Sequence, residues 1–576
     1  MCGIVGVNGC TAAVPFLLEG LRRLEYRGYD SAGIALLEAG EIQTVKCRGR
    51  VGDLAKKVER QENLSAVIGI GHTRWATRGE ANDANAHPHT CGEFSIVHNG
   101  ILENEKELKE KYLRLCPFSS DTDSEVIAQL LHRLYDGNVL ETVAKVADLL
   151  KGSFAFAVLC ADAPDALFCV RRSSPLLVGV GEAESFVASD LSAMTESVQT
   201  LYRMEDDEIA EVKRDSAAFF DFSLQPIEKA AEPFDQRQTA VNRGSFEHFM
   251  LKEIHEVPTA IRRTVQEGKL MPEADFAKPS RIFFSACGSA YHVGEAAAFV
   301  WEDWLQIPVE VSVASEFRTR KLPLPSGSWM VIVSQSGETA DSLAALREAK
   351  KQGIPVLSIV NVPNSAIAVE SDYVFYTKAG TEVAVATTKA YEAQLAAVYA
   401  LGLSLAEKWE TLDRNCIEKY KRELNRLATA AEEALKTEEQ MRAVAERMPR
   451  DEPIFFIGRG QGYAASMEAA LKLKEVSYLP AQSYPAGEMK HGTISLIRRH
   501  SPVFAFCLNE ELNAKMQCSM DELTARGAKV TAVSFSEDLQ ASERILLPKV
   551  AESFAVSMAV IPMQLLAYYT ARRLGC

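Results

Sequence analysis

The second residue of the chain is a cysteine, in the opening Met1-Cys2-Gly3-Ile4-Val5-Gly6. If Met1 is removed, Cys2 carries both a thiol and a free α-amino group. A thiolate attacks carbonyl carbon, and a neutral amine can accept or relay the thiol proton near neutral pH. Cys2 is therefore a possible nucleophile for acyl transfer. On these six residues alone, a small apolar residue that starts a buried strand is an equally good interpretation.

Four polar clusters interrupt the apolar strands of the first domain and supply further groups for such a reaction. An arginine can hold a carboxylate, an aspartate can pair with an ammonium group, and an asparagine side chain with a glycine N–H can stabilise an oxyanion. Together they could hold an α-amino acid and its tetrahedral intermediate. Each cluster alone also fits a turn, a hairpin or a helix cap. The clusters are Arg27–Gly33, His72–Gly79, His98–Gly100 and Asp121–Glu125.

Two serine-rich loops in the second half of the chain, Cys287–Ser289 and Ser334–Thr339, each follow an apolar run and precede helical sequence. In an α/β sheet such loops bind phosphate, because backbone N–H groups and hydroxyls converge at a helix N-terminus. This binding needs no net positive charge. The alternative is that these Ser and Thr residues only cap helices.

A helical segment further along carries Glu468, Lys472 and Glu475 at spacings of four and three, so they share roughly one face. A solvated ion pair on a helix surface is the first interpretation of that spacing. His491, between a lysine and a glycine, is typical of an ordinary surface residue when taken alone.

The elements that would position these residues differ between the two halves. Residues 1–225 contain short β-rich runs, such as 66–70 and 154–159, with helical patterns at 12–25 and 124–135. This mixture predicts a layered α+β domain. A polar, proline-punctuated stretch at 226–245 then predicts an interdomain linker.

Beyond residue 280, apolar strands alternate with helices, which predicts βαβ units and parallel sheets buried on both faces. The pattern occurs twice, because Ile282, Gly288 and Tyr291 recur at a constant offset as Ile454, Gly460 and Tyr463. We therefore expect two doubly wound α/β domains, at 246–425 and 426–576, connected by helical sequence from about 390 to 448. Chance matching of alanine-rich helices is the alternative.

Composition narrows the classes of protein that the chain can belong to. A formal net charge of −15 over 576 residues argues against a nucleic-acid partner and against a basic membrane-binding face. No apolar run is long enough to predict a membrane span or a signal peptide, so a cytoplasmic protein is expected. The twelve cysteines show no zinc-like spacing, which predicts free thiols and no metal site.

Taken together, Cys2 and the four clusters resemble the N-terminal-nucleophile class II glutamine amidotransferases over the whole first domain. The α/β repeat extends the resemblance over nearly the whole chain to the glutamine:fructose-6-phosphate aminotransferase family, also called glucosamine-6-phosphate synthase. The resemblance implies a glutaminase domain followed by two sugar-isomerase domains. It implies that glutamine is hydrolysed and that its ammonia passes internally to fructose 6-phosphate, which is isomerised to glucosamine 6-phosphate without a cofactor.

The resemblance also assigns roles to residues of the first domain. Cys2 would be the nucleophile, and Asn99 and Gly100 would form the oxyanion hole. Arg74 and Asp123 would hold the carboxylate and amine of glutamine. Thr77 would line the pocket, and Trp75 would act as a gate between ammonia release and transfer.

In the second half the two serine-rich loops resemble the phosphate loops of the family. Glu475 would move the proton between C1 and C2 of the sugar, with Lys472 beside it on the same helix. His491 would assist ring opening, in relatives from the neighbouring subunit, so a homodimer is expected. The phosphate-binding residues would be Gly288, Ser289, Ser334, Gln335, Ser336 and Thr339.

Several positions depart from the family pattern near the acceptor site, and Arg78 replaces a usual histidine in the glutaminase half. The family also has a short tail after its last helix, which carries a lysine able to form a Schiff base with the open ketose. The sequence ends at Leu574-Gly575-Cys576, which leaves open whether the protein continues or lacks that lysine. A paralogue acting on another sugar phosphate, as a deaminase or deglycase, and a sugar-phosphate-binding regulator are the alternative functions. The departures near the acceptor site are Ala290, Ala384, Thr387 and Thr493.

Overall fold

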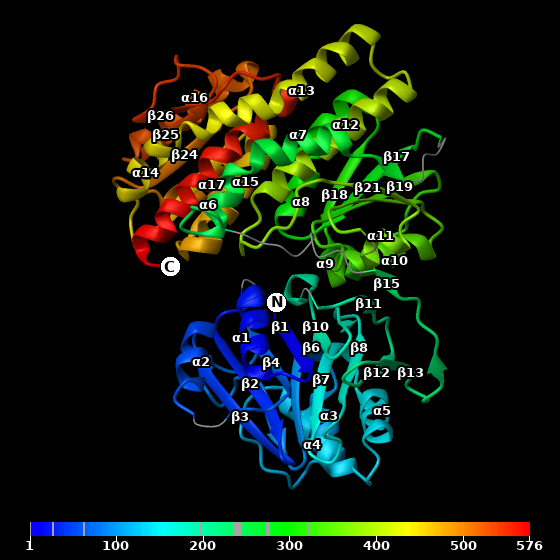
Figure 1. Cartoon of the computed structure of the whole chain (residues 1–576). Helices are drawn as coiled ribbons and strands as arrows, with labels where there is room; N and C mark the ends of the chain where they lie inside the picture. Colours follow the sequence, from blue (N-terminus) through cyan, green and yellow to red (C-terminus); the bar gives the residue numbers. More distant parts are fainter. Residues whose placement is uncertain are drawn as a thin grey trace. The chain divides into compact units, whose positions relative to one another are not determined.

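The structure, a computed structural model, describes residues 2–25, 28–61, 64–195, 197–233, 243–271, 277–320, 322–363 and 365–576. The chain divides into two compact units, Met1–Val241 and Asn242–Cys576. The colours of Figure 1 run from blue to cyan through most of the first unit and from green to red through the second. Each unit has its own sheets and its own apolar cores.

The first unit contains two antiparallel sheets. Because β1 pairs with both β4 and β10 in the first of them, the N-terminal strand lies inside the sheet and not at its edge. The first sheet has the order β15 (Glu232–Pro233), β11 (Thr200–Arg203), β9 (Leu177–Val180), β10 (Ser185–Ala188), β1 (Gly3–Asn8), β4 (Ile68–Arg74), β2 (Ser31–Glu38), β3 (Glu41–Arg48). The second has the order β14 (Pro226–Ile227), β13 (Ala217–Asp221), β12 (Glu208–Val212), β8 (Leu167–Arg172), β7 (Gly152–Cys160), β6 (Phe94–Leu102), β5 (His89–Cys91).

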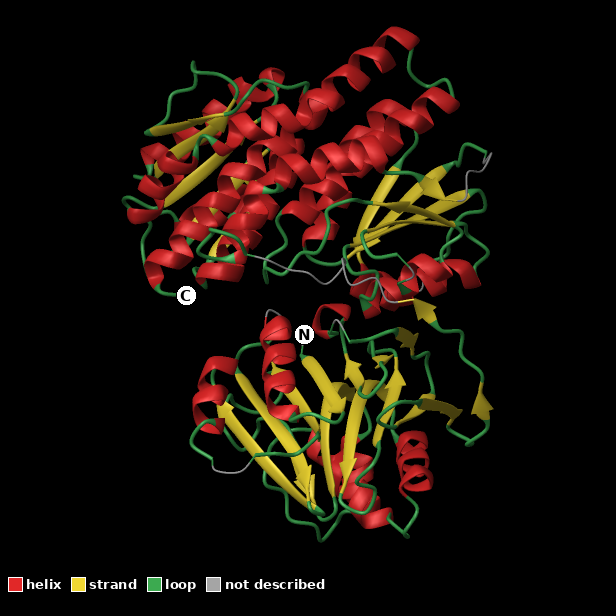
Figure 2. Cartoon of the chain, in the orientation of Figure 1, coloured by secondary structure: helices red, strands yellow, loops and turns green. Residues whose placement is uncertain are grey.

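Three apolar clusters give this unit four layers, helix on sheet on sheet on helix (Figure 2). Helices α1 (Ala13–Leu24) and α2 (Val51–Val58) pack on the first sheet. Helices α4 (Ser124–Leu134) and α5 (Val139–Leu149), with the short α3 (Glu105–Tyr112), pack on the second. The third cluster lies between the sheets. The layered α+β fold expected for the first domain is confirmed.

The second unit contains two sheets that are parallel except for one short edge strand, β16. Both sheets are covered on both faces, which explains their nearly continuous apolar strands. The first has the order β16 (Leu270–Met271), β21 (Tyr373–Tyr376), β20 (Val356–Val360), β19 (Ser328–Ser334), β17 (Arg281–Ala286), β18 (Val309–Val313). The second has the order β23 (Ala481–Pro485), β22 (Ile454–Gly458), β24 (Pro502–Cys507), β25 (Lys529–Ser534), β26 (Glu543–Leu546).

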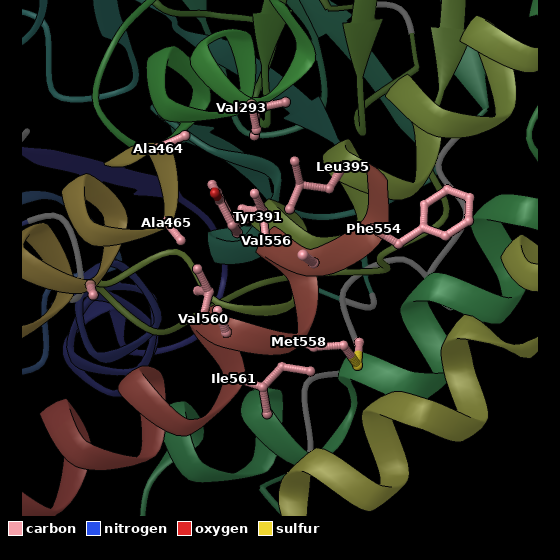
Figure 3. Packing of buried hydrophobic residues seen from close by; sticks show 14 of the residues in the cluster. Val293, Tyr391, Leu395, Ala464, Ala465, Phe554, Val556, Met558, Val560 and Ile561 are labelled. Atoms are coloured by element: carbon pink, nitrogen blue, oxygen red, sulfur yellow. The ribbon is translucent and has the colours of Figure 1, made fainter. Parts of the chain in front are cut away.

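One large apolar core is shared by the two sheets of the second unit. Figure 3 shows side chains from its central helices packing together, among them Val293, Leu395, Ala465 and Val560. These come from α8 (Ser289–Leu305), α12 (Lys389–Lys408), α15 (Gln461–Ser477) and α17 (Ala555–Leu574). The remaining helices are α6 (Phe249–His255), α7 (Val257–Glu267), α9 (Ala314–Arg320), α10 (Ala340–Lys351), α11 (Ala366–Glu370), α13 (Arg414–Leu435), α14 (Glu438–Glu446) and α16 (Asn513–Ala525).

The two halves of the second unit repeat each other in backbone detail. Gly288 precedes α8 and Gly460 precedes α15, both with φ +56° and ψ −131°. Each helix has 17 residues and ends at a left-handed residue, Gln306 or Tyr478. The sheet order is also the same if β18 is matched with β23 and β17 with β22. The expected duplication is confirmed in strand order, loop conformation and helix length.

The stretch expected to be a linker, 226–245, is structured in its first part. Residues 226–227 and 232–233 form β14 and β15, one in each sheet of the first unit, while residues 234–242 lie outside the described residues. Helix α13 crosses the division placed at residue 425. A 23-residue helical segment that contains α17, Glu552–Leu574, is apolar and long enough to span a membrane, but its apolar window is fully buried in the protein, as in a core helix.

Candidate active sites

Strand pairing brings Cys2 beside the His72–Gly79 cluster. In the antiparallel register of β1 and β4, Gly3 lies opposite Thr73, so the residue before β1 lies next to the end of β4. The Trp75 N–H donates a hydrogen bond to Cys2 Sγ at 3.3 Å, and Sγ lies 3.7 Å from the Trp75 carbonyl oxygen. A side chain at Gly3 would meet Leu24 and Thr73 at 2.7 Å, so only glycine allows this close packing.

Asn99 reaches Cys2 from the second sheet. Its Nδ2 donates a hydrogen bond to the Cys2 carbonyl oxygen at 3.1 Å, and its Oδ1 lies 3.0 Å from His72 Nε2. Asn99 lies inside β6, so the hairpin expected from Asn-Gly alone is not formed. Gly100, the next residue, has φ +137°, and a Cβ there would lie 2.0 Å from the Ser153 carbonyl oxygen. The backbone at Gly100 therefore requires glycine.

Asp123 lies at the start of α4 but does not cap the helix with its side chain. Its Oδ2 instead accepts a hydrogen bond from the Leu102 N–H at 2.8 Å, which ties α4 to the end of β6. Asp123 is only 5% exposed. The carboxylate that the resemblance assigns to the amine of glutamine is thus fixed from one side by the Leu102 N–H.

Arg74 is buried at the end of β4, and its guanidinium holds the loop that follows. It donates hydrogen bonds to the carbonyl oxygens of Arg78, Gly79 and Glu80. Asp30 supports the same loop by accepting the Ala76 N–H at 2.8 Å. Thr77 and Trp75 are exposed on this loop. Arg27, which begins the first polar cluster, lies outside the described residues.

Burial around Cys2 disfavours charge on the thiol and on the neighbouring histidines. Burial raises the pKa of the Cys2 thiol, so most of it is protonated at neutral pH and its activation needs a proton acceptor. Burial also lowers the pKa of His72 to about 3 and keeps those of His87 and His89 well below the ordinary value. The buried histidines near Cys2 are therefore neutral dipoles.

In the second unit the two serine-rich loops follow adjacent parallel strands, β17 and β19, at the same end of the sheet. Ser334 Oγ accepts the Gly337 N–H at 3.1 Å and lies 3.1 Å from Thr339 Oγ1. Ser336 Oγ accepts the Glu338 N–H at 3.2 Å. This compact turn places Ser334, Gln335, Ser336 and Thr339 before the N-terminus of α10, while Gly288 and Ser289 open α8.

Glu468, Lys472 and Glu475 on α15 form a chain of ion pairs that is buried at one end. Glu468 and Lys472 are 0% and 1% exposed, whereas 30% of the Glu475 side chain is exposed. Lys472 Nζ lies 3.5 Å from Glu468 Oε1 and 2.8 Å from Glu475 Oε2. The solvated surface pair suggested by the spacing is therefore wrong, because the neighbouring α8 and α17 cover this face of the helix.

Two contacts of Glu468 connect this chain to the first serine-rich loop. Ser289 Oγ donates a hydrogen bond to Glu468 Oε1 at 2.9 Å, and His292 Nδ1 lies 2.7 Å from Glu468 Oε2. Burial opposes ionisation of Glu468, but Lys472 and these two partners together hold its pKa below the ordinary value. The two halves of the second unit thus meet through Ser289, His292 and Glu468. Sequence reasoning did not identify His292, although it lies one turn after Gly288.

A second pair of acids, also not identified from the sequence, holds the loop before α12. Glu253 accepts the N–H groups of Val383 and Ala384, and Glu382 accepts those of Thr388 and Ala390. Burial and the neighbouring Glu382 carboxylate raise the pKa of Glu253 to about 8. These residues come from α6 and from a loop 130 positions later, so no local spacing could have indicated them.

His491 is exposed in a short 3₁₀ helix, Glu488–His491. Across the residues that the structure describes, no group of three or more His, Cys, Asp or Glu side chains is placed to hold a metal ion. All twelve cysteines are free thiols.

Comparison with known proteins places both units in described families. A glutamine amidotransferase domain matches residues 72–196, and a SIS domain matches twice, at 275–404 and 450–572. The solved C-terminal domain of glucosamine-fructose-6-phosphate aminotransferase from Francisella tularensis superimposes with a TM-score of 0.56 at 36% identity, covering 58% of this chain and 99% of that one.

Full-length relatives are more similar still. A glutamine–fructose-6-phosphate aminotransferase (isomerizing) of Clostridium tetani is 42% identical over 594 residues, covering 100% of this chain and 98% of that protein. One of Caldanaerobacter subterraneus is 42% identical over 595 residues with the same coverage. The chain belongs to the glutamine–fructose-6-phosphate aminotransferase family.

Membership of this aminotransferase family confirms the resemblance on which the sequence assignments rest. The two SIS matches also confirm the duplication of the second half. The site assignments themselves remain predictions. Arg78, the departure in the first unit, forms an ion pair with Glu105.

Proposed function

We propose that this chain is an enzyme that hydrolyses glutamine at Cys2 and transfers the ammonia to fructose 6-phosphate, giving glucosamine 6-phosphate and glutamate. Membership of the aminotransferase family supports the overall reaction. The observation that carries the assignment is the meeting of Cys2, the Trp75 N–H and the Asn99 amide at the end of β4. These are a nucleophile and hydrogen-bond donors from three segments distant in sequence.

In the donor half, the α-amine of Cys2, free after removal of Met1, takes the thiol proton. The thiolate attacks the side-chain amide carbon of glutamine, and the oxyanion is stabilised by Asn99 Nδ2 and the Gly100 N–H. Ammonia leaves with the proton held by the amine, and water then hydrolyses the thioester to glutamate. Arg74 and Asp123 hold the α-carboxylate and α-amine of the substrate, with Thr77 lining the pocket and Trp75 acting as its gate.

In the acceptor half, the serine-rich loops bind the sugar phosphate through Ser289, Ser334, Ser336 and Thr339 hydroxyls, with Gly288 and Gln335 in the same turns. Glu475 transfers the proton between C1 and C2 after ammonia has condensed with the ketose. It suits this role because it is partly exposed, whereas Lys472 behind it is buried. The buried pair of Lys472 and Glu468 fixes its position.

His491 would complete the sugar site from a second subunit, which is why we propose a homodimer. Its exposure in this chain leaves it free to contact a second subunit. A cytoplasmic location is consistent with twelve free cysteines, because reducing compartments keep thiols reduced. The acidic net charge of −15 gives no reason to expect a nucleic-acid partner.

The test is a product assay on the full chain with glutamine and a panel of sugar phosphates. We expect glutamate and glucosamine 6-phosphate with fructose 6-phosphate, and much less amination of other sugars. Amination of another sugar phosphate, or release of ammonia from an amino sugar phosphate without synthesis, would instead show the paralogue. Binding of fructose 6-phosphate with no turnover of glutamine would show a regulator and refute the proposal.

A further inference from the structure

We propose that His72 is a positioning residue that fixes the amide of Asn99, so that Nδ2 and not Oδ1 faces the reacting carbon. This inference rests on the proposed glutaminase reaction at Cys2. His72 lies in β4 and begins the polar cluster His72–Gly79, in which the sequence gives it no role. Its ring crosses from the first sheet to the second and is 0% exposed.

The position of the ring proton follows from the two oxygens that face it. His72 Nε2 lies 3.0 Å from the His98 carbonyl oxygen and 3.0 Å from Asn99 Oδ1. A carbonyl oxygen only accepts hydrogen bonds, so Nε2 must carry the proton. Nδ1 has no hydrogen-bond partner among the described residues, and a proton there would be buried and unpaired. Both the oxygens that face Nε2 and the lack of a partner for Nδ1 therefore favour the neutral ring with its proton on Nε2.

This fixed proton determines the orientation of the Asn99 amide. The N–H of His72 requires an oxygen opposite it, which places Oδ1 toward β4 and Nδ2 toward Cys2. One N–H of Nδ2 goes to the Cys2 carbonyl oxygen, and the other remains for the oxyanion. A flipped amide would present an acceptor to the oxyanion and leave two N–H groups facing each other.

The surroundings of His72 keep its ring neutral and fix its orientation. Its ring lies against His87 with centroids 4.1 Å apart, and His87 in turn contacts His89 at 4.6 Å. The Arg74 guanidinium also disfavours a positive charge on the ring. Because the pKa of His72 is lowered to about 3, the imidazole acts as a fixed dipole and not as a base at neutral pH.

The test compares two amide substitutions in the full chain by steady-state glutamate release. His72→Gln places an amide nitrogen near the position of Nε2, so it keeps the donor that faces Asn99 Oδ1. His72→Asn places the amide nitrogen near Nδ1, so this variant lacks that donor. We expect His72→Asn to lower kcat by about 10- to 100-fold, less than loss of the oxyanion donor itself, with KM for glutamine within about threefold. His72→Gln should retain kcat within about threefold.

A double variant separates positioning from general damage. Asn99→Ala should lower kcat by about 100- to 1,000-fold, and adding His72→Asn should cost less than about threefold more, because there is no amide left to orient. Independent, multiplicative losses would overturn the inference, as would equal kcat values for the Gln and Asn variants.

The tautomer can also be tested without relying on variants that fold poorly. Nitrogen-15 NMR of histidine-labelled protein should show His72 with a bare Nδ1 and a protonated Nε2 that does not titrate near neutral pH. A protonated Nδ1 or a titrating ring would overturn the inference. Failure of the proposed function is distinguishable, since glutamine hydrolysis would then survive Cys2→Ala whatever residue 72 is.

Discussion

The buried histidines of the first unit are neutral dipoles, whereas the buried side chains along α15 are ions. In the first unit, His72, His87 and His89 stay uncharged, and hydrogen bonds from Trp75 and Asn99 converge on Cys2. In the second, Glu468 and Lys472 remain charged with almost no exposure. These histidines and the α15 pair are about equally buried, so burial alone does not decide whether a side chain is neutral or charged.

The two proposed reactions explain why the sites differ. Acyl transfer develops one negative oxygen, and fixed dipoles stabilise it without having to reorganise. Isomerisation moves a proton between two carbons, which requires a base of defined charge and position. A carboxylate supported by a buried cation provides both. Substitutions on α15 should therefore test charge, and substitutions near Cys2 should test geometry.

The largest effect is expected at Glu475, the exposed end of the ionic chain. Glu475→Gln should lower kcat for glucosamine 6-phosphate formation by about 100- to 10,000-fold, because an amide cannot accept the proton. KM for fructose 6-phosphate should change little, since the phosphate loops are untouched. The measurement is product formation at saturating substrates, with glutamate release in the same samples as the control. Loss of sugar binding with an unchanged kcat would make Glu475 structural.

Replacing Lys472 should show how much stability is lost when the buried ion pair on α15 is broken. Lys472→Met leaves Glu468 without its cation, which we expect to reduce the free energy of unfolding of the second unit by about 3–5 kcal/mol. The matched control is Lys474→Met on the same helix, where the side chain is exposed and the change should stay within about 0.5 kcal/mol. Urea unfolding followed by tryptophan fluorescence suits this test, because Trp301, Trp304, Trp329 and Trp409 lie in this unit. Equal effects of the two variants would show that the pair contributes nothing.

A smaller, pH-dependent effect is expected at Glu253. Its pKa is about 8 in the folded protein and near 4.5 when unfolded, so the folded state holds a proton that the unfolded state releases. Its contribution to stability is full below about pH 4.5 and falls as pH rises to about 8, at about 1.4 kcal/mol per unit where the difference is complete. Glu253→Gln keeps a neutral acceptor for the Val383 and Ala384 N–H groups. It should therefore flatten the fall in melting temperature between pH 5 and pH 8, and an unchanged profile would contradict this pKa.

The sequence indicates which residues come together better in the first unit than in the second. The family resemblance groups Cys2, Asn99 and Gly100, and the structure brings Asn99 into contact with Cys2. The β-rich runs and helices around them also follow from periodicity, as α4 (Ser124–Leu134) and β7 (Gly152–Cys160) show. The duplication was visible because glycines and tyrosines recur at one offset.

Other features could not be predicted, because they depend on distant packing. The spacing of Glu468 and Lys472 is the same for a surface pair and a buried one, and only the covering helices decide. His72 acts on a residue 27 positions away in another sheet, and Glu253 acts on a loop 130 positions away. Charge state in a core is set by such contacts and leaves no local pattern.

The central claim is that the two chemistries reside in separate sites, with Cys2 serving only the first. The most direct test is Cys2→Ala in the full chain, assayed with glutamine and, separately, for interconversion of fructose 6-phosphate and glucose 6-phosphate. The account predicts that glutamate release disappears while isomerisation stays at the level of the unaltered chain. Glutamine hydrolysis that survives the substitution, or isomerisation that is lost with it, would contradict the account.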